Sequence, residues 1–266
     1  MALVEDVEAL SRAFSGIGID EKSIISIVGK WHPEHTDSFR KGSVLLWTMH
    51  PWERDARMIK ESLIKGPQSY GVIIEIACTR SSEQLLGARK AYHSLFDRSI
   101  EEDVAQRISD INRNFFVALV SPYRYEGTRV NEETAKSEAK VIASAIKNSG
   151  DGLVKNAEVL RILATRSKLY LKELSQGEWI LRNAIGCLCS PPTYFSKILD
   201  MALNVKADEH TKDALTRVVV TRADTDMKEI NEEYQKLYGI PLSQKIEEKT
   251  NGNYKDFLLT LVARGN

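Results

Sequence analysis

The chain has 266 residues, which is long enough to bury a large core as one repeat array or as two modest domains. Lysine plus arginine equal aspartate plus glutamate at 37 each, so no bulk charge attracts nucleic acid or an acidic membrane. The three cysteines are an odd number, which argues against a disulfide framework and favours the cytosol. We expect no secretory signal, and apolar runs such as 115–120 are too short to span a bilayer.

Four copies of an apolar segment that ends in a basic residue occur along the chain. In chain order, the basic residues are Lys30, Arg80, Arg166 and Arg222. They lie 50, 86 and 56 residues apart. If the middle interval is complete, the first repeat lacks about 36 residues (86 − 50) and the third about 30 (86 − 56). The breaks would fall near Lys41–Gly42 and near Gln176–Gly177.

The second and fourth copies match each other without a gap over 41 residues. The matched pairs are Thr79 and Thr221, Tyr92 and Tyr234, Leu95 and Leu237, Phe96 and Tyr238, Ile100 and Leu242, Val104 and Ile246, Phe115 and Phe257, Leu119 and Leu261, and Val120 and Val262. Segments with the same apolar spacing should fold as the same unit, so we predict a repeat protein. The predicted repeats are 1–64 (shortened), 65–146 (complete), 147–203 (shortened) and 204–266.

Apolar residues follow the three-and-four spacing of buried helix stripes, and no alternating strand pattern stands out. The predicted fold class is therefore all-α, with about five helices in a complete repeat. In the second repeat these helices are 69–78, 83–95, 100–108, 114–121 and 132–146. Ser81 with Gln84 and Ser99 with Glu102 have the spacing of capping boxes at helix starts. Pro241 stands at the position that matches Ser99 and is compatible with a helix start.

Four repeats of about five helices, with a Thr-Arg-Ser turn at 79–81 and a Tyr-x-x-Leu-Phe helix at 92–96, resemble the annexin family. The segments Trp52–Arg57 and Leu86–Tyr92 are similar to plant annexins in particular. The resemblance implies a curved all-α, four-repeat annexin-like array, truncated in repeats 1 and 3. Its convex face would dock on anionic phospholipid through bound Ca²⁺. The resemblance also implies a cytoplasmic, peripherally membrane-associated protein, with protein partners and self-association on membranes as further expectations.

Calcium would supply the charge that this neutral chain lacks, because it accepts six to eight oxygens, including backbone carbonyls and a bidentate carboxylate. In the family, the carbonyls come from a Gly-x-Gly-Thr loop before the first helix of a repeat. The first repeat carries Phe14-Ser15-Gly16-Ile17-Gly18-Ile19-Asp20, with Ile19 in place of threonine. By this match Phe14, Gly16 and Gly18 would donate carbonyl oxygens to the metal. An ordinary flexible helix entry is the alternative interpretation of the two glycines.

The remaining parts of a calcium site are weaker. The family's carboxylate, from the loop after the third helix, would fall in the stretch that the first repeat lacks. The substitutes on offer are Asp20, Glu21, Glu53 and Asp55. In the second repeat Gly66 is kept but Arg107 stands at the acid position, and the fourth repeat has Lys249 there. Gly150 and Gly152 of the third repeat are out of register. A cation in place of a carboxylate opposes metal binding, so at most one site has visible support.

Other clusters of functional residue types have plainer interpretations. His32 and His35 have zinc-ligand spacing, but no second pair of ligands accompanies them, and a short polar loop accounts for them. Cys187 and Cys189 point to different faces of an apolar helix. A redox role for Cys78 has no supporting pattern.

The sequence contains no phosphate-binding loop, nucleophile elbow or metalloprotease helix, so we predict no catalytic site and no enzyme activity. Three functions stay open. The first is calcium-dependent phospholipid binding at a membrane surface. The second is a calcium-independent helical scaffold for protein partners. The third is a redox- or ion-handling annexin variant.

Overall fold

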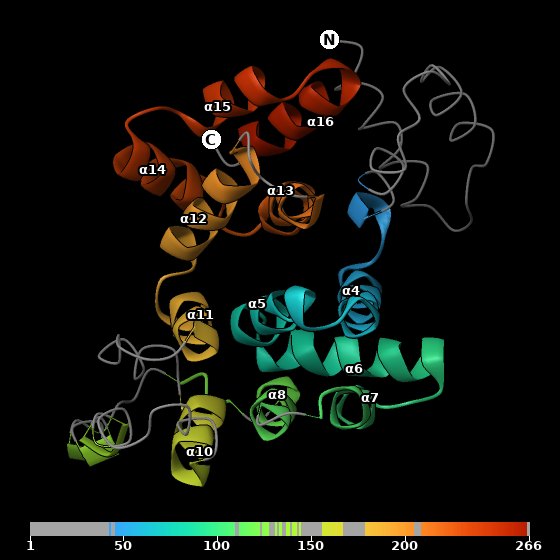
Figure 1. The fold of residues 1–266 in the computed structure, drawn as a ribbon, viewed down its shortest axis with the longest axis vertical. Helices are drawn as coiled ribbons and strands as arrows, with labels where there is room; N and C mark the ends of the chain where they lie inside the picture. The colour runs from blue at the N-terminus through green and yellow to red at the C-terminus, as the bar shows by residue number, and fades with distance from the viewer. Residues whose placement is uncertain are drawn as a thin grey trace. The chain divides into compact units, whose positions relative to one another are not determined.

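All regular elements in the described part of the chain are helices, as the apolar spacing predicts (Figure 1). The computed structural model describes Ser43 and residues 46–109, 112–122, 124–127, 156–166, 179–204 and 209–264, with scattered positions between 131 and 144. It divides into two compact units. Residues 50–194 form one, which we call the central unit, and residues 1–49 with 195–266 form the other, the terminal unit.

The central unit contains the helices of the second repeat and part of the third. They are α4 (Pro51–Lys65), the 3₁₀ turn η2 (Pro67–Ser69), α5 (Gly71–Thr79), α6 (Ser82–Phe96), α7 (Ile100–Arg107), α8 (Arg113–Val120), α10 (Ala157–Thr165) and α11 (Trp179–Cys189). The second-repeat helices agree with the predicted ones to within two residues, which is the ordinary uncertainty of helix ends. The described positions of the predicted helix 132–146 are also nearly all helical.

The terminal unit repeats the same order of helices. α12 (Pro191–Leu203) begins at the end of the central unit and continues into the terminal one. It is followed by α13 (Glu209–Arg222), α14 (Met227–Tyr238), α15 (Leu242–Lys249) and α16 (Gly252–Ala263). Pro241 is the N-cap of α15, as expected from its position.

The core of the second repeat forms where α4 packs on α6, and where α8 packs against α5 and α7. Tyr92, Phe115 and Phe116 are at most 1% exposed. In the terminal unit, the repeat counterparts Tyr234 and Phe257 are buried as well, at 0% and 4% exposed. Burying one such side chain contributes roughly 1.5–3 kcal/mol, so the matched apolar positions account for the shared architecture.

Side chains at the helix starts explain where α6 and α7 begin. Ser81 accepts from the amide of Gln84 at 3.1 Å, and the Gln84 side chain accepts from the amide of Ser81 at 2.9 Å. Ser99 and Glu102 form the same reciprocal pair at 3.1 and 2.9 Å. Both predicted capping boxes are therefore confirmed, and each satisfies amides that a helix end would leave unpaired.

The third repeat has too little chain for two of its expected helices. In the second repeat, 32 residues separate Arg80 from Arg113, and they contain α6 and α7. In the third repeat, only the 12 residues 167–178 separate Arg166 from the start of α11. Counterparts of α6 and α7, at 15 and 8 residues, do not fit into that length. The predicted repeat bounds and the break near Gln176–Gly177 themselves lie partly outside the described residues.

A short strap joins the second repeat to α10 within the central unit. The Arg124 guanidinium donates to the carbonyl oxygens of Leu163 and Arg166, at 2.6 and 2.8 Å, at the end of α10. Two residues later, Glu126 accepts from the amide of Ser82 at 2.5 Å, at the start of α6. Burial lowers the pKa of Arg124 below its ordinary value, because desolvation disfavours its charge. The strap therefore caps one helix from each of two repeats.

Candidate functional site

The arginine that marks the second repeat holds two helices together. Its Nε and Nη2 atoms donate to Oδ2 and Oδ1 of Asp55, at 2.6 and 2.8 Å. Arg80 stands directly after α5, whereas Asp55 lies in α4 and is 1% exposed. Planar guanidinium and carboxylate groups bind in this two-pronged way with high geometric specificity. The pair is a structural fixture, and Asp55 is not available as the calcium carboxylate for which it was a candidate.

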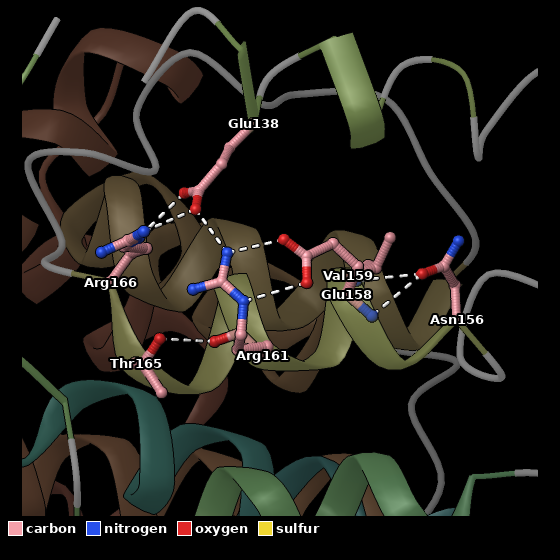
Figure 2. A network of polar contacts seen from close by, with 7 residues as sticks. All are labelled: Glu138, Asn156, Glu158, Val159, Arg161, Thr165 and Arg166. Atoms are coloured by element: carbon pink, nitrogen blue, oxygen red, sulfur yellow. Dashed lines mark hydrogen bonds and ion pairs between the residues drawn. The ribbon is translucent and has the colours of Figure 1, made fainter. Parts of the chain in front are cut away.

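The third repeat builds a larger version of this pair, shown in Figure 2. Glu138, 6% exposed, accepts from Arg166 at 2.5 and 2.8 Å and from Arg161 at 2.5 Å. Arg161 also binds Glu158 at 2.7 and 3.0 Å. Hydrogen bonds from Glu158 and then Glu138 raise the pKa of Arg161, since both favour its charged form. The Asn156 side chain caps the same helix by accepting from two amides.

The spacing of these pairs explains the shifted glycines of the third repeat. Asp55 and Arg80 are 25 residues apart, but Glu138 and Arg166 are 28 apart. If the two pairs are equivalent, the third repeat has three extra residues between its acid and its arginine. The predicted loop containing Gly150 falls within that interval, which accounts for its displacement from the second-repeat register.

The fourth repeat replaces the partner. Arg222 binds Asp226, four residues later, at 2.6 and 2.7 Å, and its guanidinium lies 4.9 Å from the Phe195 ring centroid. The position 25 residues before Arg222 holds Lys197, which cannot pair with it. The repeat arginines therefore keep a counter-charge in each described repeat, but not the same one.

The loop of the second repeat that matches the predicted calcium loop is already folded into a turn. Aligning Arg80 with Lys30 places Ile64, Gly66 and Gln68 opposite Phe14, Gly16 and Gly18. The carbonyl oxygen of Gly66 accepts from the amide of Ser69 at 2.9 Å, and that of Lys65 accepts from the Gln68 side chain at 2.5 Å. Gly66 has φ +92°, a conformation that glycine tolerates best. One of the three candidate carbonyls is thus occupied by the turn.

The acid position of the second repeat lies at the same end of the repeat as this loop. Tyr70, directly after η2, contacts Phe116 in the first half of α8, with ring centroids 5.4 Å apart. The start of α8 therefore lies near the loop. Arg107 ends α7, six residues before α8 begins, and is exposed. In the fourth repeat Lys249 likewise ends α15 and is exposed. Within the described residues, no group of three or more His, Cys, Asp or Glu side chains is placed to hold a metal ion.

Phe14, Gly16 and Gly18 lie outside the described residues, as do His32 and His35, so their predicted roles stay predictions. Glu53, another candidate carboxylate, binds Arg57 at 2.8 Å on the surface of α4.

The cysteines lie in the core of the central unit or at its edge. Cys78 and Cys187 are buried, Cys189 is half-buried, and none of the three forms a disulfide. Their burial matches the expected role as small core residues.

What sequence reasoning missed are the partners of the repeat arginines, Asp55, Glu138 and Asp226. A signal was present for two of them, because an acid precedes Arg80 by 25 residues and Arg166 by 28. Such a spacing carries no local periodicity, and the third repeat shifts it by three residues.

Helical repeats with a marker arginine and a loop end define the class of protein, and comparison with known proteins gives the family. A family model described as Annexin matches residues 54–119 and 200–261. Annexin D4 of Arabidopsis thaliana is 46% identical over 319 residues, covering 100% of both proteins. Annexin Gh1 of Gossypium hirsutum is 38% identical, covering 97% of this chain and 94% of that protein. The chain therefore belongs to the annexin family and is similar to plant annexins.

The fold agrees with this assignment. A solved structure of annexin III matches with a TM-score of 0.75 at 24% sequence identity, over 100% of this chain and 94% of that chain. The four-repeat all-α architecture expected from the repeats is thereby confirmed. The match to Annexin D4 extends over 319 residues, more than the 266 of this chain, so that relative has residues without a counterpart here. None of the described helices combines the length and apolarity needed to cross a membrane.

Proposed function

We propose that the protein binds phospholipid membranes in a calcium-dependent manner, as a peripheral protein of the cytoplasm. The observation that carries this proposal is its membership of the annexin family along its whole length, together with a Gly-x-Gly loop in the first repeat. Anionic lipid is the partner that a divalent ion would recruit. Protein partners and self-association on the membrane are further parts of the proposal, for which the repeat faces offer surface.

The first repeat carries the proposed site. There the carbonyl oxygens of Phe14, Gly16 and Gly18 would hold Ca²⁺, with a coordination position left for a lipid phosphate. The ion supplies positive charge to a chain whose lysines and arginines are balanced by acids at 37 each. The second repeat argues for one site only, because its Gly66 carbonyl is used by a turn and Arg107 stands at the acid position.

Co-sedimentation with phosphatidylserine vesicles tests this function, first with calcium and then with a chelator. We expect the pelleted fraction to rise with calcium, and the variant Gly16→Val with Gly18→Val to lose that rise, because side chains there obstruct the turning of the carbonyls. Gly71→Val is a matched control, since an added Cβ at Gly71 meets nothing within 4 Å. Equal pelleting of the unmodified protein under both conditions would refute calcium dependence.

A calcium-independent scaffold is the second candidate. The cations Arg107 and Lys249 favour it, because they stand where the family would offer a carboxylate. Loss of the calcium response, with folding intact, would select this function over the first.

A further inference from the structure

Two repeats carry an exposed cation at the position of the metal-binding acid. Arg107 ends α7 in the second repeat, and Lys249 ends α15 in the fourth. They are 142 residues apart, the same interval that separates Arg80 from Arg222. The same replacement has therefore occurred at equivalent places, each in the last turn of a helix.

The surroundings of Arg107 suit a lipid surface. We define the loop end of the second repeat as residues 64–69, 107–109 and 112–113. Its Ile64 side chain is 62% exposed, which is unusual for a large aliphatic residue of an amphipathic helix. Next to it, Lys65 pairs with Glu61 at 2.8 Å in a solvent-exposed arrangement, and such pairs are weak and easily exchanged.

The charges at this loop end favour an anionic partner. Arg113 is exposed and uses its Nε to bind the Ile108 carbonyl at 2.8 Å, which leaves its charge at the surface. Lys65, Arg107 and Arg113 are all cations, and Glu61 faces them from α4 through its pair with Lys65. The sequence adds one acid between α7 and α8, at position 110, which lies outside the described residues. Three positive charges thus exceed two negative ones around an exposed apolar side chain.

We infer that the loop ends of the second and fourth repeats bind anionic phospholipid headgroups directly, through Lys65, Arg107 and Lys249. Ile64 enters the interfacial layer of the bilayer beside them. Lysine and arginine pair with phosphate without a metal, and arginine does so through a fork of donors. Part of the membrane affinity is therefore independent of calcium, and these repeats add to the calcium bridge of the first. This inference rests on the proposed membrane-binding function.

The test compares two triple variants of the full chain by vesicle co-sedimentation in chelator. One carries Lys65→Gln, Arg107→Gln and Lys249→Gln. The control carries Lys90→Gln, Lys228→Gln and Lys236→Gln, three exposed lysines of α6 and α14 that change the net charge equally. The vesicles are phosphatidylcholine with or without phosphatidylserine, at low and at physiological salt. Circular dichroism confirms that both variants keep the helix content of the unmodified protein.

We expect calcium-free binding to phosphatidylserine vesicles, weakened by salt and absent with phosphatidylcholine alone. Each charge near the surface is worth about fivefold in binding, so the loop-end variant should lose on the order of 100-fold in partitioning. The control variant should lose much less. Equal losses in the two variants, or no calcium-free binding by the unmodified protein, overturn the inference. The calcium-induced rise is measured separately in the same assay, so failure of the calcium bridge is distinguishable from failure of the cation contacts.

Discussion

Replacing Arg80 by alanine is expected to lower the free energy of unfolding by about 3–5 kcal/mol, because Asp55 would stay buried without its counter-charge. The two side chains are 10% and 1% exposed, and two hydrogen bonds join them. Urea denaturation followed by circular dichroism at neutral pH measures the change. The arginine marks the repeat in the sequence, so this variant tests whether the marker is structural.

The control for this variant is Arg57→Ala on the same helix as Asp55. Arg57 binds Glu53 at 2.8 Å, but the two side chains are 45% and 39% exposed. Exposed pairs at this spacing contribute about 0.3–0.5 kcal/mol, so the control should change stability by well under 1 kcal/mol. If Arg80→Ala were as mild as this control, the ion pair between α4 and α5 would not support the fold.

Replacing Asp103 by alanine is expected to cost a similar amount, about 3–5 kcal/mol, because three groups lose a shared buried acceptor. Asp103 is 1% exposed and accepts from Lys60 and from the Tyr92 hydroxyl, each at 2.6 Å. It also pairs with Arg98 at 2.8 Å. Tyr92→Phe removes a single bond and should cost about 1–2 kcal/mol.

The same carboxylate gives the protein a pH dependence at acid pH. Burial alone would raise the pKa of Asp103, but the hydrogen bonds from Lys60 and Tyr92 outweigh it and leave the pKa below its ordinary value. A lowered folded-state pKa stabilises the protein above the ordinary value, about 3.9, and that contribution is lost as pH falls through the lowered pKa. The stability gap between the unmodified protein and Asp103→Asn should therefore shrink between pH 7 and pH 3. A gap that is constant with pH would contradict the lowered pKa.

Much of the fold follows from local sequence. The capping boxes at Ser81 and Ser99 were predictable because both partners lie within four residues of each other. The buried tyrosines Tyr92 and Tyr234 followed from the repeat register. Their hydroxyl partners did not: Tyr92 binds Asp103, whereas Tyr234 binds Asp200 at 3.2 Å, and Lys245 occupies the position that matches Asp103. Equivalent cores thus hide non-equivalent polar contacts, which no apolar spacing encodes.

Less of the site was predictable. Asp55 was a candidate calcium ligand on composition alone, and the structure gives it to Arg80, 25 residues away. The residue types of a loop also do not fix its carbonyl directions, which depend on backbone dihedral angles. Gly66 shows this, because its carbonyl turns to Ser69 even though the residue aligns with Gly16. The assignment of Phe14, Gly16 and Gly18 therefore rests on resemblance to the family.

The number of calcium ions bound per chain tests the account most directly. Isothermal titration calorimetry with Ca²⁺, in the presence of phosphatidylserine vesicles, supplies it. The account predicts a stoichiometry of about one, from the single repeat that keeps both glycines of the loop, and none in the variant with Gly16→Val and Gly18→Val. Zero bound ions in the unmodified protein, or a stoichiometry of two or more that survives in the variant, would contradict it.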